Sequence, residues 1–169
     1  MRTGRPEHLR TFNYRGLHRY FLTFCTFNRL ARFTDGARVH VARTQILRAC
    51  VEQEFALTAY CFMPDHVHLL VEGTTDGSDC LRLIARAKQY SGFYYRRRFG
   101  QTLWQRYGYE HTLRSDEQML SVARYIIENP VRAGLVAHAG DYPYVGSETH
   151  GLGAILDAVQ VMPTWRRSG

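Results

Sequence analysis

The sequence predicts an α+β domain, with an antiparallel sheet that carries two helices on one face. Three observations support this class. Up to residue 113, the apolar segments follow the order strand, helix, strand, strand, helix, strand. The two segments expected to be helices repeat their apolar residues at helical spacing. The length of 169 residues suits one domain that buries its core without disulfides.

The first predicted strand covers residues 20–27 and is apolar on both faces, so we place it inside a covered sheet. Asp35 and Gly36 then turn the chain into a helix. The apolar side of this helix is expected to hold Val39, Ile46, Leu47, Cys50, Val51 and Phe55.

Two strands follow at residues 57–62 and 66–71, and residues 63–65 join them as a short turn or a bulge. After a loop at residues 73–77, a second helix is predicted over residues 80–99. The buried side of this second helix would comprise Leu81, Ile84, Ala85, Ala87 and Phe93.

A strand around residues 102–113 completes the order of a ferredoxin-like (RRM-like) sandwich, in which one sheet face is left open. An additional C-terminal helix begins at a capping box at residues 115–118. We predict that it ends at Asn129, because the residue before Pro130 is pushed out of the helical region. This helix could cover part of the open face.

The charge of the chain predicts a polyanionic partner, most plausibly nucleic acid. The formal net charge is +7, and of the 22 basic residues only Lys88 is lysine. Guanidinium groups suit bidentate contacts with phosphate. A solvated arginine-rich surface is the alternative. Residues 1–19, which include Arg15, are either a basic arm along a phosphate backbone or a frayed terminus.

Cysteine spacing and hydropathy place the protein in the cytoplasm. The four cysteines are widely spaced and form no Cys-x-x-Cys pair, which is typical of reduced thiols. No apolar run is long enough to cross a membrane, and the first residues lack the apolar core of a secretion signal. We therefore expect no membrane partner.

The helix predicted over residues 80–99 combines basic and aromatic side chains, which suits single-stranded or hairpin nucleic acid. Arginines can hold phosphates, and aromatic rings can stack on bases. A solvated amphipathic helix would have a similar pattern. The basic side chains are Arg82, Arg86, Lys88, Arg96, Arg97 and Arg98, and the rings are Tyr90, Tyr94 and Tyr95.

Two histidines alternate with aliphatic residues in the strand predicted over residues 66–71. His66 and His68 share one face of this strand, because successive side chains point to opposite faces. Two imidazoles about 7 Å apart along a strand can close on one divalent ion. Pro64 indicates that they lie near a strand end. An ordinary polar strand face is the alternative, so a metal site needs a further ligand.

Tyr125 and Asn129 lie four residues apart on the C-terminal helix. Residues at this spacing share a helix face, with their Cβ atoms about 5–6 Å apart. A phenol and an amide are therefore expected to emerge together, beside the apolar stripe. Each residue also has an ordinary structural interpretation, because tyrosines often pack and an asparagine before proline often ends a helix.

Together these segments resemble the REP-associated tyrosine transposases, the single-tyrosine branch of the HUH nuclease superfamily. The resemblance runs in order from about residue 14 to residue 148, which indicates one catalytic domain over residues 1–148 with a basic N-terminal arm. Residues 149–169 form a C-terminal tail of unknown role. The segments that carry the resemblance are residues 63–70, 103–106, 110–111, 113–114, 124–136 and 141–144.

The resemblance implies a metal-dependent endonuclease and strand transferase that acts on single-stranded DNA. It would cleave at hairpin sites like repetitive extragenic palindromes, through a 5′-phosphotyrosine on Tyr125. His66, His68 and Asn129 would bind Mg²⁺ or Mn²⁺. Asp65 stands where many relatives have asparagine, which could alter the affinity for the ion. The resemblance also favours a monomer with its site assembled in one chain.

Several alternatives stay open at this point. Glu110 and His111 could supply the third ligand, because their strand is expected to neighbour the histidines. Trp104 and Arg114 could stack a base and hold a phosphate, although a core tryptophan and a surface arginine fit equally well.

Other nucleophiles and other functions are also possible. Tyr90, Tyr94 and Tyr95 are rival nucleophiles, but none is followed by an amide four residues later. The whole chain could instead be a non-catalytic module of the same fold that binds hairpin DNA. A metal phosphodiesterase for small nucleotides is a third interpretation.

Overall fold

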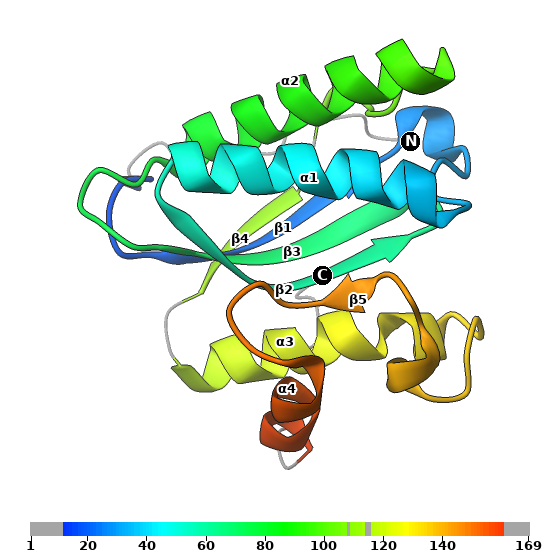
Figure 1. Cartoon of the computed structure of the whole chain (residues 1–169). Coiled ribbons are helices and arrows are strands. Elements are labelled where there is room, and N and C mark those ends of the chain that lie inside the picture. Colours follow the sequence, from blue (N-terminus) through cyan, green and yellow to red (C-terminus); the bar gives the residue numbers. More distant parts are fainter. Residues whose placement is uncertain (1–11, 108, 114–115, 161–169) are drawn as a thin grey trace.

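A five-stranded antiparallel sheet forms the centre of the protein in this computed structural model, which describes residues 12–107, 109–113 and 116–160. The sheet order is β4-β1-β3-β2-β5 (Figure 1). The first four strands in this order have the ferredoxin-like arrangement, which confirms the predicted fold class. The strands are β1 (Arg19–Cys25), β2 (Phe55–Met63), β3 (His66–Gly73), β4 (Tyr109–Leu113) and β5 (Val145–Gly146).

Helices cover both faces of the sheet. The helices α1 (Gly36–Glu52) and α2 (Cys80–Phe99) lie side by side on one face. The helix α3 (Asp116–Arg132) lies on the opposite face, and the short α4 (Leu152–Val159) packs against it (Figure 1). Two 3₁₀ turns, η1 (Phe27–Arg29) and η2 (Ala139–Asp141), lie in connecting segments.

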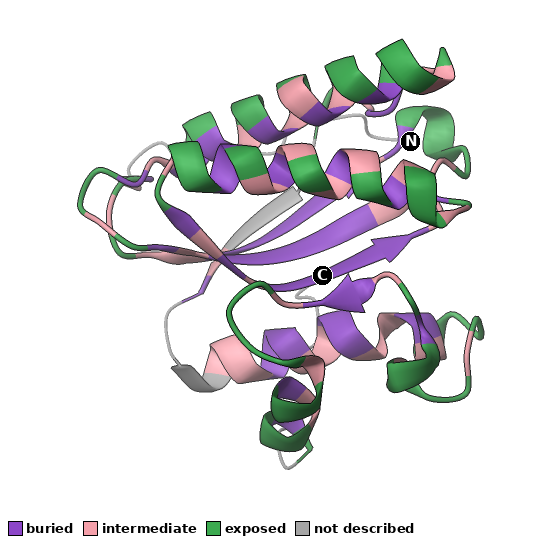
Figure 2. Cartoon of the chain, in the orientation of Figure 1, coloured by how far each residue is buried: buried purple, intermediate pink, exposed green. Residues whose placement is uncertain are grey.

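Alternation along β1 builds two cores, one on each face of the sheet. Tyr20, Leu22 and Phe24 pack towards α1 and α2, whereas Phe21 packs towards α3. Figure 2 shows that the central strands are buried along most of their length. This confirms the prediction that the first strand is interior and covered. The strand ends at Cys25, before the predicted end, because the chain turns into η1.

The helix α1 begins where the sequence predicts, because the Asp35 carboxylate accepts a hydrogen bond from the backbone N–H of Arg38 at 2.9 Å. The predicted apolar side is wrong at its end. Val51 is 78% exposed, and Phe55 is the first residue of β2. Val51 directly follows the buried Cys50, so it lies about 100° further round the helix.

The bounds of α2 agree with the prediction, but its buried side agrees only in part: Ala87 is buried and Ile84 packs against the core. Leu81 and Phe93 are exposed. The buried side includes two polar residues, Ser91 and Tyr95, because each has a partner: Ser91 Oγ accepts from Trp104 Nε1 at 2.8 Å, and Tyr95 donates to the backbone carbonyl of Arg32 at 2.7 Å. The full buried set is Cys80, Leu83, Ala87, Ser91 and Tyr95.

The helix α3 continues through Pro130 to Arg132, so the prediction that it ends at Asn129 is wrong. Pro130 lies in the last turn, where its missing N–H removes only one helical hydrogen bond. The backbone N–H of Ala133 still donates to the Asn129 carbonyl at 3.0 Å. Gly134 then closes the helix with a φ of +73°. The predicted capping box begins at Ser115, which lies outside the described part of the chain.

The strand predicted around residues 102–113 is shorter in the structure, where β4 begins only at Tyr109. Trp104 forms an isolated bridge to Thr26 and packs in the core that faces α1 and α2. Within the described residues, each helix is too short or too polar to cross a membrane.

Candidate active site

His66 and His68 lie at the start of β3, on the sheet face that α3 covers. A two-residue turn at Pro64 and Asp65 joins β2 to β3, so His66 opens its strand opposite Met63. The Nε2 atoms of the two histidines are 3.2 Å apart. The sequence prediction that the rings share one face therefore agrees with the structure.

Each histidine is held at Nδ1, so its Nε2 faces the other ring. The Thr23 hydroxyl on β1 lies 2.8 Å from Nδ1 of His68, its cross-strand neighbour. The Asp65 carboxylate lies 2.7 Å from Nδ1 of His66 and accepts from the Arg29 guanidinium at 2.9 Å. Partners of this kind fix the ring orientation of histidine ligands in metal sites.

The electrostatic surroundings keep His66 neutral and Asp65 charged. Burial lowers the pKa of His66, and this effect outweighs the opposite influence of Asp65. Burial alone would raise the pKa of Asp65, but the hydrogen bond to His66 and the charge of Arg29 bring that pKa below its usual value. A neutral imidazole is the form that binds a metal ion.

Tyr125 projects from α3 towards His68. Their ring centroids are 5.8 Å apart at an interplanar angle of 64°. Phe21 of β1 contacts the Tyr125 ring edge-on at 5.9 Å, and the Arg132 guanidinium lies 4.1 Å from the ring centroid. Arg132 also donates to the backbone carbonyl of Tyr125. The phenol is therefore brought beside the histidine pair within one chain.

Asn129 is half-buried on the same helix, one turn after Tyr125. Its spacing from Tyr125 puts both residues on one helix face. Within the described residues, groups of three His, Cys, Asp or Glu able to hold an ion are absent.

Glu110 and His111 do not lie on the neighbouring strand, and this part of the prediction is wrong. β1 separates β4 from β3, and the register pairs Glu110 with Leu22 and His111 with Phe21. Adjacent strands are about 4.8 Å apart, so the backbone of β4 lies about 10 Å from that of β3.

The predicted nucleic-acid contacts on α2 lie on the other side of the sheet from Tyr125. Arg86, Arg96 and Arg97 are exposed. Tyr90 donates to Glu52 at 2.6 Å. Lys88 donates to the carbonyls of Gln105 and Arg106, and burial lowers its pKa to about 8.

The other predicted contacts have different surroundings. Arg15 is exposed and lies 3.5 Å from Asp79. Trp104 is buried, contacts Phe24 and Phe33 at 5.6 Å each, and has its N–H bound to Ser91. This position favours core packing over base stacking. Arg114 lies outside the described residues.

Sequence reasoning missed three residues that hold the site together: Thr23, Arg29 and Arg132. Thr23 could not be found without the register between β1 and β3. Arg132, however, follows Tyr125 by seven residues, which is two helical turns. Helical spacing would have revealed it had the helix been extended beyond Pro130.

The ferredoxin-like sheet, the His-x-His pair and the helix-borne tyrosine beside it define a class of nucleic-acid enzyme. Residues 15–129 match the family model of IS200-like transposases, so the chain belongs to this family. Its members are transposases, and the enzyme class predicted from the sequence is confirmed.

Individual relatives narrow the resemblance to the REP-associated tyrosine transposases. The Escherichia coli K12 protein of that name is 27% identical over 129 residues, which cover 74% of this chain and 73% of the relative. A Haemophilus influenzae Rd protein, whose name places it provisionally in the same group, is 29% identical over 137 residues, covering 74% and 77% of the two chains.

A solved structure agrees with the fold. The structure of a REP-associated tyrosine transposase bound to a REP hairpin superposes with a TM-score of 0.68 at 21% identity. The match covers 82% of this chain and 81% of the other. The family resemblance stated from the sequence motifs is therefore confirmed.

Proposed function

We propose that this protein is a metal-dependent endonuclease and strand transferase that acts on single-stranded DNA beside hairpins. The observation that carries the proposal is the position of His68, whose ring contacts both His66 and the ring of Tyr125. A metal-binding pair and a nucleophile would thus meet within one chain. The hairpin-bound relative supports a hairpin substrate for this chain.

The histidine pair fits a divalent cation. Two nitrogens about 2.1 Å from one ion, at an angle between about 90° and 110°, are about 3.0–3.4 Å apart. The separation of 3.2 Å between the two Nε2 atoms lies within this range. Asn129 would add an amide oxygen, and so few protein ligands suit Mg²⁺ or Mn²⁺, which keep open positions for water and phosphate. The bound cation would polarise the scissile phosphate and stabilise the leaving oxygen.

Tyr125 would act as the nucleophile. Its phenol loses a proton, its oxygen forms a bond to phosphorus, and the bond from phosphorus to the 3′ oxygen breaks. The 3′ oxygen takes up a proton, which leaves a free 3′-hydroxyl and a 5′-phosphotyrosine. Attack by another 3′-hydroxyl on this ester joins a new strand and restores the tyrosine, so the sequence needs no ATP.

The remaining parts of the proposal concern assembly and location. Because His68 and Tyr125 of the same chain are in contact, we infer that one chain assembles the site, as a monomer would require. Because the proposed substrate is DNA, we propose that the protein acts in the cytoplasm. The domain would comprise residues 1–148, and its basic N-terminal arm, of which residues 1–11 lie outside the described part of the chain, would contact phosphates.

Incubation with a labelled hairpin carrying a single-stranded flank, in Mg²⁺ or Mn²⁺, tests the proposal. After denaturation, we expect a covalent DNA adduct that disappears in Tyr125→Phe and in His68→Ala. A Tyr90→Phe variant serves as the control, because it removes the phenol of a rival nucleophile on the other side of the sheet. Tight binding without an adduct would instead indicate a non-catalytic hairpin-binding module. Cleavage of small nucleotides without an adduct would indicate a phosphodiesterase.

A further inference from the structure

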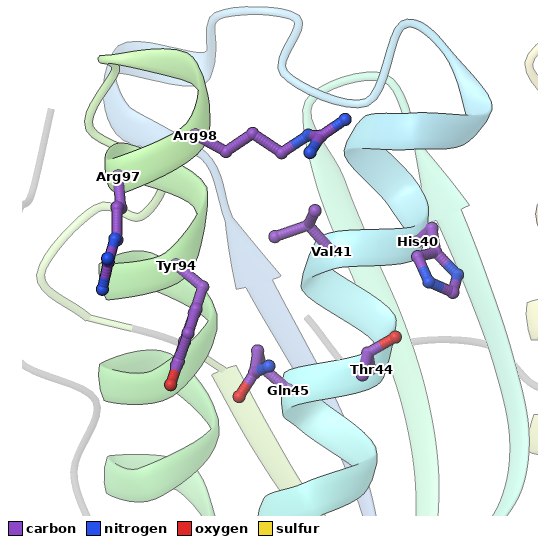
Figure 3. A pocket seen from close by; sticks show the side chains of 7 residues that line it. All are labelled: His40, Val41, Thr44, Gln45, Tyr94, Arg97 and Arg98. Atoms are coloured by element: carbon purple, nitrogen blue, oxygen red, sulfur yellow. The ribbon is translucent and has the colours of Figure 1, made fainter.

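A groove lies between α1 and α2, on the face of the sheet opposite Tyr125. Its cavity volume is about 460 Å³. Figure 3 shows Arg98 reaching from α2 towards α1, and Gln45 pointing from α1 towards α2. We call this the α1–α2 groove, and its lining residues are His40, Val41, Thr44, Gln45, Tyr94, Arg97 and Arg98.

Within the described residues, the arginines beside the groove lack a carboxylate partner, as does Arg86, which donates to Gln89 at 2.9 Å instead. Four of the eight arginines of α1 and α2 have a carboxylate within 4.0 Å, in the pairs Arg38–Asp35, Arg43–Glu148, Arg48–Glu52 and Arg82–Asp79. Within the described residues, Arg96, Arg97 and Arg98 have no such partner. They stabilise the C-terminal end of α2 through the helix dipole, but their charges are otherwise uncompensated. An anionic group in the groove would compensate them.

Aromatic and amide groups accompany this charge. Phe93 is 58% exposed and Tyr94 is 38% exposed, and their rings meet edge-on at 5.2 Å. The Oε1 atom of Gln45 is buried, and it has no hydrogen-bond partner within the part of the chain that the structure describes. A rotation of this amide would present an acceptor or a donor to the groove. The arginines could therefore bind a phosphate, the ring of Tyr94 could stack on the face of a base, and the amide of Gln45 could bind the edge of a base.

The groove lies at the same end of the molecule as the histidine pair. Tyr95, next to the groove residue Tyr94, donates to the carbonyl of Arg32 at 2.7 Å. The N–H of Arg32 in turn donates at 2.9 Å to the carbonyl of Pro64, two residues before His66. A DNA strand leaving the catalytic face can thus pass around this end to reach the groove.

We propose that the α1–α2 groove binds an unpaired nucleotide of the DNA strand that flanks the hairpin. Its phosphate contacts Arg97 and Arg98, and its base stacks on Tyr94. An unpaired nucleotide fits better than duplex, because a base face must be free to stack on a side chain. The cavity also has the size of a small-ligand pocket, about 300–1,000 Å³. The inference rests on the DNA substrate proposed above.

Fluorescence anisotropy with two labelled DNAs tests this site. One DNA is a blunt hairpin, and the other is the same hairpin with an unpaired flank on each side. All proteins carry Tyr125→Phe, so that binding is measured without reaction. The groove variants are Tyr94→Leu and the pair Arg97→Gln with Arg98→Gln. The control pair is Arg48→Gln with Arg82→Gln, which removes the same charge outside the groove.

Tyr94→Leu is expected to weaken binding of the flanked hairpin at least about five-fold, with little change for the blunt hairpin. For the flanked hairpin, the Arg97 and Arg98 pair should reduce the slope of log affinity against log salt by about 0.7, because the variant no longer neutralises the one phosphate that both arginines contact. The control pair should leave the preference for flanked DNA unchanged. Circular dichroism verifies folding.

Two results would overturn the inference. Equal losses on blunt and flanked DNA would indicate a contact with the duplex stem, and groove variants that bind like the control pair would indicate no contact. The proposed function fails separately, through the absence of a Tyr125 adduct in the catalytically intact chain. If the parent protein does not bind DNA, both the groove inference and the proposed function are wrong.

Discussion

The Thr23 hydroxyl lies 2.8 Å from Nδ1 of His68, across the register between β1 and β3. Both side chains are buried, so the hydroxyl fixes the ring that contacts both His66 and Tyr125. In metal sites such a partner sets which nitrogen of the histidine faces the ion.

Thr23→Val should therefore reduce Mn²⁺ affinity about 10- to 100-fold, because it removes the hydroxyl and keeps the shape of the side chain. Isothermal titration of the DNA-free protein with Mn²⁺ measures this directly. Thr23→Ser retains the hydroxyl and is the matched control, expected to bind nearly as the parent does. Equal Mn²⁺ affinity of Thr23→Val and the parent would show that Thr23 does not orient the ligand.

Arg132 positions Tyr125 through two contacts, one with the face of its ring and one with its backbone carbonyl. Its charge would also stabilise negative charge that develops on the phenol oxygen. Arg132→Met should slow adduct formation between about two-fold and thirty-fold, the range expected for removal of one cation–π interaction. Single-turnover rates at saturating DNA measure the effect.

Arg124→Met is the control for Arg132, because both arginines pair with Glu128. We expect the control variant to react within about two-fold of the parent, because it removes only an ion pair worth about 0.5 kcal/mol and keeps both contacts of Arg132 with Tyr125. Equal slowing in both variants would assign the effect to Glu128 and the helix, and not to Tyr125.

Local sequence rules predicted the parts of the site that depend on one element at a time. Strand alternation placed His66 and His68 on one face of their strand, and helical spacing placed Tyr125 and Asn129 on one face of their helix. Contacts between elements were not predictable in this way. The partnership of Thr23 with His68 depends on strand register, and the separation of β4 from β3 depends on sheet order.

Two further errors arose because the structural context of a residue overrides its usual local preference. Ser91 and Tyr95 are polar, yet α2 buries them because Trp104 and the Arg32 carbonyl satisfy their hydroxyls. Pro130 normally signals a helix end, but in the last turn it costs only one hydrogen bond.

Burial of His66 predicts a pH-dependent stability. Its pKa in the folded protein is below the usual value near 6.5, because burial disfavours the charged ring. As pH falls, His66 takes up a proton in the unfolded chain before it does so in the folded protein. The stability that is present above about pH 6.5 is therefore lost gradually, until the pH reaches the lower pKa of the folded state. Asp65 contributes in a separate pH range. Because its pKa is lowered in the folded protein, the charged carboxylate stabilises the fold above about pH 4, and this contribution is lost as pH falls further and the group takes up a proton.

Thermal melts of the metal-free protein between pH 8 and pH 5 measure the contribution of His66. The melting temperature should decrease as pH falls through 6.5, and His66→Asn should flatten part of this decrease. His138→Asn, at an exposed position before η2, is the control and should keep the full decrease. A profile of His66→Asn identical to that of the parent would contradict the assignment.

Trp104 provides a test that separates core packing from base stacking. Trp104→Phe removes the N–H donor to Ser91 and part of the packing against Phe24 and Phe33. We expect a loss of about 1–3 kcal/mol in the free energy of unfolding, with unchanged affinity of the folded protein for DNA. Urea unfolding and anisotropy measure the two quantities. Weaker DNA binding at unchanged stability would restore the stacking interpretation.

The helix α4 lies in residues 149–169, where the family resemblance ends, yet it packs against α3. Ile155 is buried in the core that also contains Val122 and Ile126 of α3. If α4 is an integral part of the domain, Ile155→Ala should lower the free energy of unfolding by about 2–4 kcal/mol. Asp157→Ala truncates an exposed side chain on the same helix and should change it by less than about 0.5 kcal/mol. Urea denaturation measures both, and equal small effects would instead place the end of the stable domain near residue 148.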